Sequence, residues 1–393
     1  MAETSVFKID PQSFEESLLI GPAGVIRDGG LVVFPTETVY GLGANALNSR
    51  AVMSIFEAKG RPQDNPLICH ISDYEGLSIL AKAVPKCAEA MAEAFWPGPL
   101  TMIFPKAGCV PYEVSAGLDT VAVRMPSNEI ARSLIRLSGV PVAAPSANLS
   151  GRPSPTSFEH VQHDMFGKVD VIIDGGECGV GVESTVVDVS VWPPVVLRPG
   201  GVTMEQLTEV VPEVRLFEGH SSDVTGSGPA RSPGLRHKHY APRAAVYLLE
   251  GTGDEQATDI EKYLVAGGLN GRKTGFMVSE ETMSSLYSYI SPRENCDIQS
   301  VKRFCEEKMA NGPVEFCNGA FAFEVVGRRD DLTTVAHGLF RSLRDLDEAG
   351  VEVILAETFP EIGMGLAIMN RLSRSAGGKK ARDLLNEDIQ VSD

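Results

Sequence analysis

Hydrophobic and polar positions form short runs along the first half of the chain, which predicts a layered structure of strands and helices. Residues 31–34 are an apolar run between Gly29-Gly30 and Pro35, which is typical of a buried strand. Residues 51–59 have apolar side chains at helical spacing, and the pattern stops at Gly60. The same pattern predicts strands at 66–71, 100–104, 120–124, 140–144, 169–174, 184–189 and 194–198, and helices at 86–95 and 127–138. Because predicted strands and helices are mixed without strict alternation, we expect an α/β domain with a twisted, mixed sheet.

The pattern changes twice after residue 211. Residues 213–243 have almost no periodic apolar signal, and so long an irregular stretch is unusual inside one compact domain. From residue 244 predicted strands and helices alternate. The strands are at 244–249, 274–278, 320–326 and 351–355, and the helices at 255–266, 298–310, 331–349 and 365–376. This alternation predicts a smaller, Rossmann-like parallel sheet. We therefore expect a first domain at 1–212, an interdomain linker or lid at 213–243, and a C-terminal domain at 244–393.

Composition narrows the classes of function. The 393 residues include 35 Lys and Arg against 52 Asp and Glu, a net charge of −17, which argues against a protein that coats nucleic acid. No run of about 20 apolar residues predicts a membrane span, and the first residues have neither a basic start with an apolar run nor an arginine, so we expect a cytoplasmic location. The seven cysteines are scattered without a CxxC pair, which favours reduced thiols over metal or disulfide roles.

Common catalytic motifs are absent from the sequence. It contains no GxxxxGK[ST], no GxGxxG after a strand, no HExxH and no GxSxG, and no Ser/His/Asp or Cys/His arrangement favours covalent catalysis. Polar residues gather instead beside predicted strands in four segments: 35–43, 59–70, 124 with 144–154, and 181–185 with 198–200.

Four cations stand at the ends of predicted elements, beside Gly, Pro, Ser or Asn: Lys59, Arg61, Arg124 and Arg198. If these ends share one edge of the sheet, they form a positive pocket suited to a triphosphate or a carboxylate. Each has a plainer explanation as well, because cations are common at helix C-termini and Ser and Asn are common in turns. A histidine in an apolar strand, such as His70, is most often a satisfied core residue.

Together these segments resemble the Sua5/YrdC/YciO family, specifically its long two-domain Sua5 type. The resemblance runs through PTETVYGLG at 35–43, KGRPQDNPL at 59–67, FWPGPLT at 95–101, SAN at 146–148, SGRPSPT at 150–156, GVESTVVD at 181–188, RPG at 198–200 and SPGLRHKHYAP at 232–242. The C-terminal half matches by its alternating pattern and by NRLSRSAGG at 370–378. The resemblance implies a YrdC-like, twisted mixed-sheet catalytic domain with a cavity, followed by a Sua5 C-terminal domain.

The resemblance also implies a reaction. In this family L-threonine, bicarbonate or CO2, and ATP give threonylcarbamoyl-AMP and pyrophosphate, and the product serves t6A37 formation in tRNA. We therefore expect a nucleotidyltransferase that uses Mg²⁺ with ATP, has no metal ligands of its own, and hands its product to a tRNA threonylcarbamoyl transferase machinery. We expect neither membrane association nor stable tRNA binding.

Matched position by position, the family implies these roles. The residues expected to contact L-threonine are Thr36, His70, Arg124, Ala144 and Ser184. Those expected to contact ATP are Arg61, Asn65, Thr120, Ser146, Ser154 and Arg198, with Lys59 and Asn148 lining the same cavity and Tyr240 reaching over it as part of a lid. Lys59, Arg61 and Arg124 are the expected catalytic residues.

Two alternatives stay open at this point. One is an RNA-binding or regulatory YrdC-type module without this activity, although the acidic charge argues against it. The other is a carbamoyl-transfer or regulatory relative that keeps the cavity and takes a different substrate.

Overall fold

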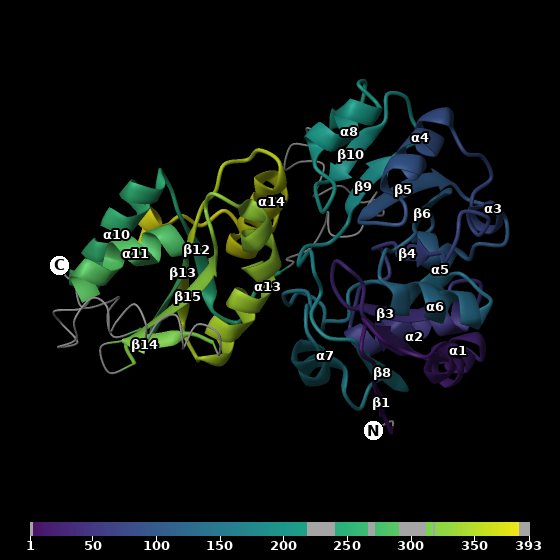
Figure 1. Ribbon diagram of the computed structural model, residues 1–393, viewed down its shortest axis with the longest axis horizontal. Helices are drawn as coiled ribbons and strands as arrows, with labels where there is room; N and C mark the ends of the chain where they lie inside the picture. The colour runs from purple at the N-terminus through teal and green to yellow at the C-terminus, as the bar shows by residue number, and fades with distance from the viewer. Residues whose placement is uncertain (1–2, 218–239, 266–271, 291–311, 317–318, 385–393) are drawn as a thin grey trace. The chain divides into compact units, whose positions relative to one another are not determined.

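The computed structural model describes residues 3–217, 240–265, 272–290, 312–316 and 319–384 (Figure 1). The chain divides into two compact units, Met1–His237 and Lys238–Asp393. The expected helix at 298–310 and residues 218–239 of the expected linker lie outside the described residues.

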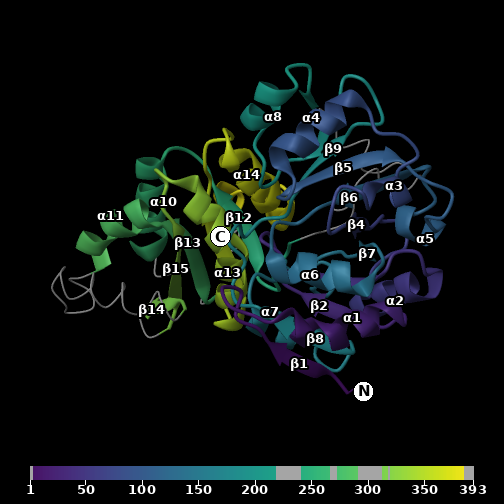
Figure 2. The ribbon, with the colours of Figure 1, turned by 45° about the vertical axis from the view of Figure 1, so that its right-hand side comes forward.

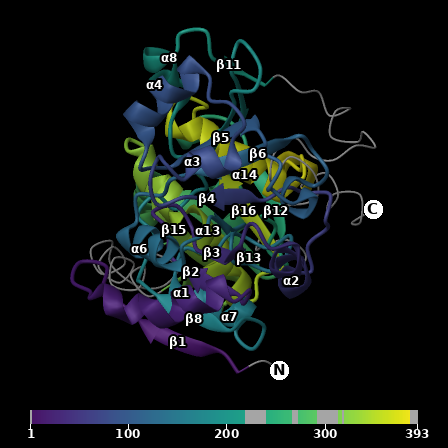
Figure 3. The ribbon, with the colours of Figure 1, turned by 90° about the vertical axis from the view of Figure 1, so that its right-hand side faces the viewer.

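The first unit is built on a mixed sheet of eleven described strands. β1 and β11 lie at its opposite ends (Figure 3). In spatial order the strands are β1 (Ser5–Lys8), β8 (Val171–Asp174), β2 (Val32–Phe34), β3 (Gly41–Asn45), β7 (Val142–Ala143), β4 (Ile68–His70), β6 (Thr120–Arg124), β5 (Leu100–Pro105), β9 (Thr185–Asp188), β10 (Val195–Arg198) and β11 (Arg215–Leu216). The expected twisted mixed sheet is confirmed.

One face of this sheet packs against helices along most of its length. The helices are α2 (Ser49–Lys59), α3 (Leu77–Leu80), α4 (Lys86–Phe95), α5 (Tyr112–Ser115), α7 (Phe158–Met165) and α8 (Met204–Val210). In α2 the side chain of Asn48 accepts hydrogen bonds from the backbone N–H groups of Arg50 and Ala51, and Gly60 ends the helix at φ 60°. This end places Lys59 and Arg61 directly at the loop that leads to β4.

The opposite face is covered by helices over only one half. There η1 (Glu16–Leu19), α1 (Ile20–Arg27) and α6 (Glu129–Ser138) pack on β2, β7 and β8, as Figure 2 shows for α1 and α6. The other half has a small apolar strip on β4, β5, β6, β9 and β10, formed by Ile68, Ile103, Ala122, Val186 and Leu197. No residue of a described helix belongs to this strip. The helical cover therefore stops where the strands with the expected site residues begin.

The second unit has a five-stranded sheet in the order β12 (Ala245–Leu249), β16 (Val353–Glu357), β13 (Thr274–Ser279), β15 (Phe321–Gly327) and β14 (Val314–Phe316). Helices α10 (Gly253–Val265) and α11 (Glu280–Ile290) cover one face, and α13 (Leu332–Glu348) and α14 (Met364–Ala376) the other (Figure 1). The first four strands are parallel, as expected, but β14 is antiparallel to β15. It lies at the edge, where a short antiparallel strand is common.

Some short elements were not predicted from the sequence. Arg215–Leu216 forms β11, so the expected linker begins inside the first sheet: its backbone pairs with β10, and the N–H of Phe217 donates to Val196 at 2.9 Å. Gly41–Asn45 forms β3, paired with β2 and β7. Its glycines are explained by packing, since a Cβ at Gly43 would lie 2.7 Å from Phe34 Cε1 and 2.8 Å from Val142 Cγ1.

Gly43 and Gly24 should respond oppositely to the same substitution. Gly43→Ala should lower the free energy of unfolding of the first unit by about 1–3 kcal/mol, because the added methyl meets two core side chains. Gly24→Ala should raise it by about 0.5–1 kcal/mol, because Gly24 lies inside α1 with open space around its Cβ position. Urea unfolding followed by circular dichroism measures both; equal effects would contradict the packing explanation.

Candidate active site

The strand order brings five polar side chains from distant parts of the sequence to one edge of the first sheet. His70 and Arg124 end the parallel strands β4 and β6 and are paired in register. Thr101, near the start of β5, is paired with Arg124 in the antiparallel direction. Ser184 directly precedes β9, which is parallel to β5, and Arg198 ends β10, which is antiparallel to β9. These residues therefore share one end of their strands.

A second polar group gathers at the opposite ends of the same strands. Thr120 begins β6, and Asn65 lies just before β4. Ser146 follows β7, which runs antiparallel to β4, and pairs with Gly41 in an isolated bridge. Four residues of strand separate the Cα atoms of Thr120 and Arg124 by about 13 Å. The expected ATP-contacting residues Asn65, Thr120 and Ser146 thus lie at one end, and the expected threonine-contacting residues His70, Arg124 and Ser184 at the other.

The two ends are joined by the apolar strip. Side chains two residues apart in a strand share a face, so Arg124 and Thr120 lie on the face of Ala122, and His70 lies on the face of Ile68. Ala144 borders the strip, since its N–H donates to the carbonyl of Ile68 at 2.9 Å. The site is therefore a sheet face that is polar at both ends and apolar between them.

The guanidinium of Arg124 organises the first end. It is 4% exposed, and its Nε donates to the carbonyl of Gly98 at 3.3 Å. Its Nη1 donates to Thr38 Oγ1 at 2.9 Å, and its Nη2 lies 2.7 Å from Glu37 Oε1. Thr36 Oγ1 lies 2.8 Å from Thr38 Oγ1 and donates to the carbonyl of Val39 at 2.6 Å. These bonds fold the loop after β2 onto Arg124.

Ser184 and Arg198 form a second buried cluster at the same end. Arg198 is 5% exposed and donates from Nε and Nη2 to the carbonyl of Ser184, at 3.2 and 2.9 Å. The hydroxyl of Ser184 lies 2.8 Å from that of Thr101. Arg198 therefore positions Ser184 as well as supplying charge.

Lys59 is held by the Ser146–Asn148 loop. Its side chain is buried, and Nζ donates to the carbonyls of Ser146 and Asn148, both at 2.5 Å, and to Asn148 Oδ1 at 3.4 Å. Ser146 Oγ donates to the same Oδ1 at 2.5 Å. The ammonium thus directs its three donors to this loop, so Lys59 has a clear structural role there.

Arg61 and Ser154, which are also expected to contact ATP, make contacts with neighbouring loops. Arg61 Nη2 donates to the carbonyls of Asn65 and Pro66, at 3.3 and 3.1 Å. Ser154 Oγ donates to Glu183 Oε1 at 2.5 Å, and both residues are buried. Sequence reasoning singled out neither Glu183 nor Glu37, although both lie inside the quoted motifs, at 181–188 and 35–43.

The buried polar atoms of the site that have no hydrogen-bond partner within the described residues include Asn65 Oδ1 and His70 Nδ1. Buried polar atoms are normally paired, so both are suited to a ligand. Burial, with the nearby charge of Arg124 adding to it, lowers the pKa of His70 to about 3. The imidazole is therefore neutral near pH 7 and offers a hydrogen-bond acceptor.

Tyr240 packs inside the second unit. Its ring stacks on Phe340 of α13 with centroids 5.3 Å apart, and the guanidinium of Arg371 lies 5.8 Å from the ring centre. Its backbone has φ 63°, which is uncommon for a bulky residue. These contacts give the expected lid residue an anchor; its expected contact with ATP stays a prediction.

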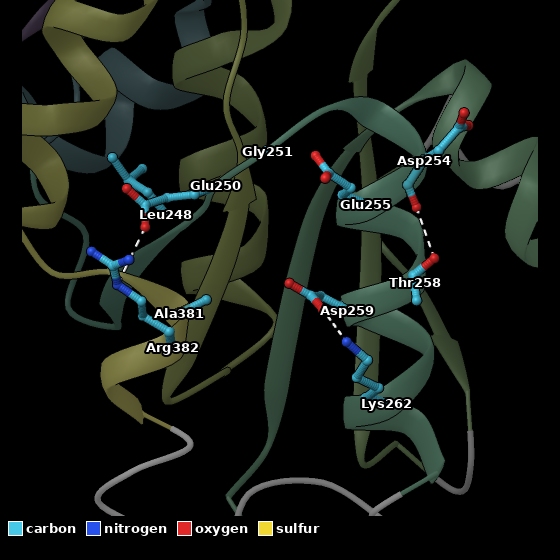
Figure 4. A pocket seen from close by; sticks show the side chains of 10 residues that line it. All are labelled: Leu248, Glu250, Gly251, Asp254, Glu255, Thr258, Asp259, Lys262, Ala381 and Arg382. Atoms are coloured by element: carbon cyan, nitrogen blue, oxygen red, sulfur yellow. Dashed lines mark hydrogen bonds and ion pairs between the residues drawn. The ribbon is translucent and has the colours of Figure 1, made fainter.

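The second unit also has a pocket of about 590 Å³ (Figure 4). Four of its charged groups form two ion pairs, Lys262 with Asp259 at 2.7 Å and Arg382 with Glu250 at 3.4 Å. Glu255 Oε2 accepts hydrogen bonds from the backbone N–H and the hydroxyl of Thr252. None of the expected site residues lines this pocket.

The described residues contain no candidate metal cluster, no disulfide and no candidate membrane helix. No group of three or more His, Cys, Asp or Glu side chains among them is placed to hold a metal ion. Cys69, Cys87, Cys109 and Cys178 are free thiols, and the other three cysteines lie outside the described ranges. No helix within these ranges has the length and apolar character needed to cross a membrane.

A sheet face with buried guanidinium and hydroxyl groups at one end, and amide, hydroxyl and cationic groups at the other, suits an enzyme that joins a nucleotide to a small acid. Residues 24–200 match the Sua5_yciO_yrdC family model, described as telomere recombination, and residues 202–377 match the model of the threonylcarbamoyl-AMP synthase C-terminal domain. The chain belongs to the Sua5/YrdC/YciO family and, within it, to the two-domain threonylcarbamoyl-AMP synthases. The expected family is confirmed.

Relatives match along nearly the whole chain. The threonylcarbamoyl-AMP synthase of Pyrococcus abyssi is 47% identical, over 90% of this chain and 93% of its own length. That of Bacillus subtilis is 43% identical, over 95% of this chain and 97% of its own. The crystal structure of P. abyssi Sua5 complexed with L-threonine matches with a TM-score of 0.81 and 44% identity, covering 96% of this chain and 98% of that one.

Because His70 is neutral when folded, it should make the first unit sensitive to acid. The unfolded chain binds a proton near pH 6.5 and the folded chain only near pH 3, so unfolding takes up a proton between these values and stability falls as pH falls. From pH 6.5 to 5 this one group should remove about 2 kcal/mol. Urea unfolding at pH 7.5 and 5 should show a smaller loss for His70→Gln than for wild type. His163→Gln, at an exposed histidine, is the control; equal losses in wild type, His70→Gln and His163→Gln would contradict the assignment.

Proposed function

We propose that this chain forms L-threonylcarbamoyl-AMP and pyrophosphate from L-threonine, bicarbonate or CO2, and ATP, for threonylcarbamoylation of tRNA. The proposal is carried by relatives named threonylcarbamoyl-AMP synthase at 43–47% identity over 90% or more of both chains. The two-ended site supports it, because a threonine and a nucleotide need different groups at a distance from each other.

At the threonine end, each polar group has a role that its chemistry supports. Arg124 offers a planar guanidinium for the threonine carboxylate. The unpaired Nδ1 of His70 accepts a hydrogen bond from the threonine hydroxyl, which favours threonine over amino acids without one. Ser184, held by Arg198, lines the same end.

At the nucleotide end, the unpaired Oδ1 of Asn65 and the hydroxyls of Thr120 and Ser146 are suited to contacts with ATP. Negative charge builds on phosphoryl oxygens as the carbamate attacks the α-phosphorus and pyrophosphate leaves. Arg61 at this end and Arg198 at the threonine end are preorganised guanidinium groups that stabilise that charge. Lys59 contributes by holding the Ser146–Asn148 loop in place.

Mg²⁺ would accompany ATP rather than occupy a resident site. The carboxylate, thiol and imidazole groups of the described residues form no cluster that would hold it alone. Bound to the phosphates, the ion would help neutralise the leaving pyrophosphate.

Pyrophosphate release with each amino acid, with and without bicarbonate, is the deciding experiment. We expect release that requires ATP, L-threonine and bicarbonate together. Release with another amino acid instead would favour the relative with a different substrate. Salt-dependent tRNA binding without ATP turnover would favour the RNA-binding alternative, against which the net charge of −17 argues.

Arg61 and Arg198 should separate the two substrates kinetically. Arg61→Ala should lower kcat/KM for ATP about 10–100-fold, the loss typical of a charged hydrogen bond, and leave the threonine KM unchanged. Arg198→Ala should affect ATP similarly and also raise the threonine KM, because Ser184 loses its hydrogen bonds from Arg198. Arg50→Ala, exposed on α2, is the control and should keep wild-type kinetics; unchanged rates in Arg61→Ala and Arg198→Ala would contradict these roles.

Removal of metal should abolish turnover without unfolding the protein. Excess chelator should stop pyrophosphate release, and added Mg²⁺ should restore it. The Tm of the ligand-free protein should be the same with and without chelator, because the described residues contain no group of three or more His, Cys, Asp or Glu side chains placed to hold a metal ion. A drop in Tm with chelator would instead reveal a structural metal.

A further inference from the structure

The carboxylate of Glu37 lies in an unusual setting within the threonine end. Its Oε1 is 2.7 Å from Arg124 Nη2, and its side chain is 14% exposed. Both carboxylate oxygens are buried, and neither has a partner with hydrogen-bond geometry among the described residues. A buried carboxylate normally accepts several hydrogen bonds, and leaving its oxygens unpaired costs free energy. This carboxylate is therefore set to accept donors from elsewhere.

The hydroxyls beside Glu37 do not supply those donors. Thr36 Oγ1 donates to the carbonyl of Val39, and Thr38 Oγ1 accepts from Arg124. The backbone of Glu37 is fixed at the same time, because its carbonyl accepts from the N–H of Val180 at 2.7 Å. Glu37 is thus held in place and paired in charge with Arg124, while its carboxylate accepts no hydrogen bond among the described residues.

An Arg–Glu pair at this spacing complements a zwitterionic α-amino acid. Arg124 attracts the carboxylate, and Glu37 attracts the ammonium group one carbon away. An ammonium group carries three N–H donors, which would supply the hydrogen bonds that Glu37 lacks. The pair thereby selects both the charge pattern and the orientation of the amino acid.

We propose that Glu37 binds the α-ammonium group of threonine and accepts its proton, so that the neutral amine attacks bicarbonate. This inference rests on the proposed function. An N–H proton passes to the Glu37 carboxylate, and the nitrogen lone pair forms a bond to the bicarbonate carbon. The C–O bond to hydroxide breaks, and a second N–H proton leaves with the hydroxide as water. The resulting carbamate is the nucleophile for the α-phosphorus, and Glu37 later returns its proton to solvent.

The surroundings of Glu37 leave it as the base at this end. Arg124 faces it from β6, and the buried thiol of Cys178 faces it from the loop after β8. Burial raises the pKa of Cys178, so this thiol stays protonated. His70, beside Arg124 in register, has a pKa near 3 and holds a proton poorly near pH 7. Neither neighbour therefore competes for the ammonium proton.

Glu37→Gln tests the proposal because it keeps the size of the side chain and removes the base. At pH 7 we expect kcat/KM for threonine to fall about 100-fold or more, as for other general bases. The loss should shrink as pH rises, because solution then supplies an increasing share of threonine as the neutral amine. Pyrophosphate release at saturating ATP and bicarbonate, from pH 6.5 to 9.5, measures this. A loss that is the same at every pH would show a purely structural role and overturn the proposal, as would no loss at all.

Two further variants complete the test. Glu93→Gln, an exposed carboxylate on α4, should match wild type at every pH. If circular dichroism shows that Glu37→Gln is unfolded, Glu37→Asp replaces it, since a shorter carboxylate keeps the charge but not the reach. A reduced rate with a pH-dependent ratio to wild type supports the proposal, and a wild-type rate or a constant ratio contradicts it. A wild-type protein without threonine-dependent release would remove the proposed function itself.

Discussion

The buried guanidinium of Arg124 is the constraint on which the site depends. A charge that is only 4% exposed costs several kcal/mol unless partners surround it. Its partners come from two separate segments, the carbonyl of Gly98 before β5 and the Glu37–Thr38 loop after β2. Satisfying Arg124 therefore closes that loop onto the sheet face that lacks helical cover. The geometry suited to a small zwitterion follows from the solvation of one charge.

Much of the fold could be predicted because its long elements carry strong local signals. Apolar spacing and Gly60 predicted helix α2 at 51–59; its C-terminal end is right, and it begins two residues earlier, at Ser49 after the Asn48 cap. The alternation after residue 244 predicted four parallel strands, and these form. The sequence pattern placed four cations at the ends of predicted elements, and the sheet brings two of them, Arg124 and Arg198, to one edge. Local pattern works where the element is long or is closed by special backbone residues.

The elements and residue roles that the sequence did not predict depend on contacts with residues far along the chain. Gly41–Asn45 looks like a glycine-rich turn, yet it is a strand because Phe34 and Val142 fill the space that side chains would need. β11 has two residues, too few for any periodicity. Glu37 reads as an ordinary turn residue until Arg124, 87 positions later, is placed beside it. Likewise, the role of Lys59 in holding the Ser146–Asn148 loop is a contact between segments, which no local pattern contains.

The acidic charge of the protein gains a specific meaning from these contacts. Near the site, Arg124 is paired with Glu37, Arg198 with the carbonyl of Ser184, and Lys59 with two loop carbonyls. The cations are thus already directed to protein oxygens, so a substrate must join or replace defined hydrogen bonds instead of entering a bare positive field. A long polyanion gains little from such recessed and partly satisfied charges on a body of net charge −17. A small molecule that reaches them individually gains more, and this favours action on ATP and an amino acid before the tRNA is engaged.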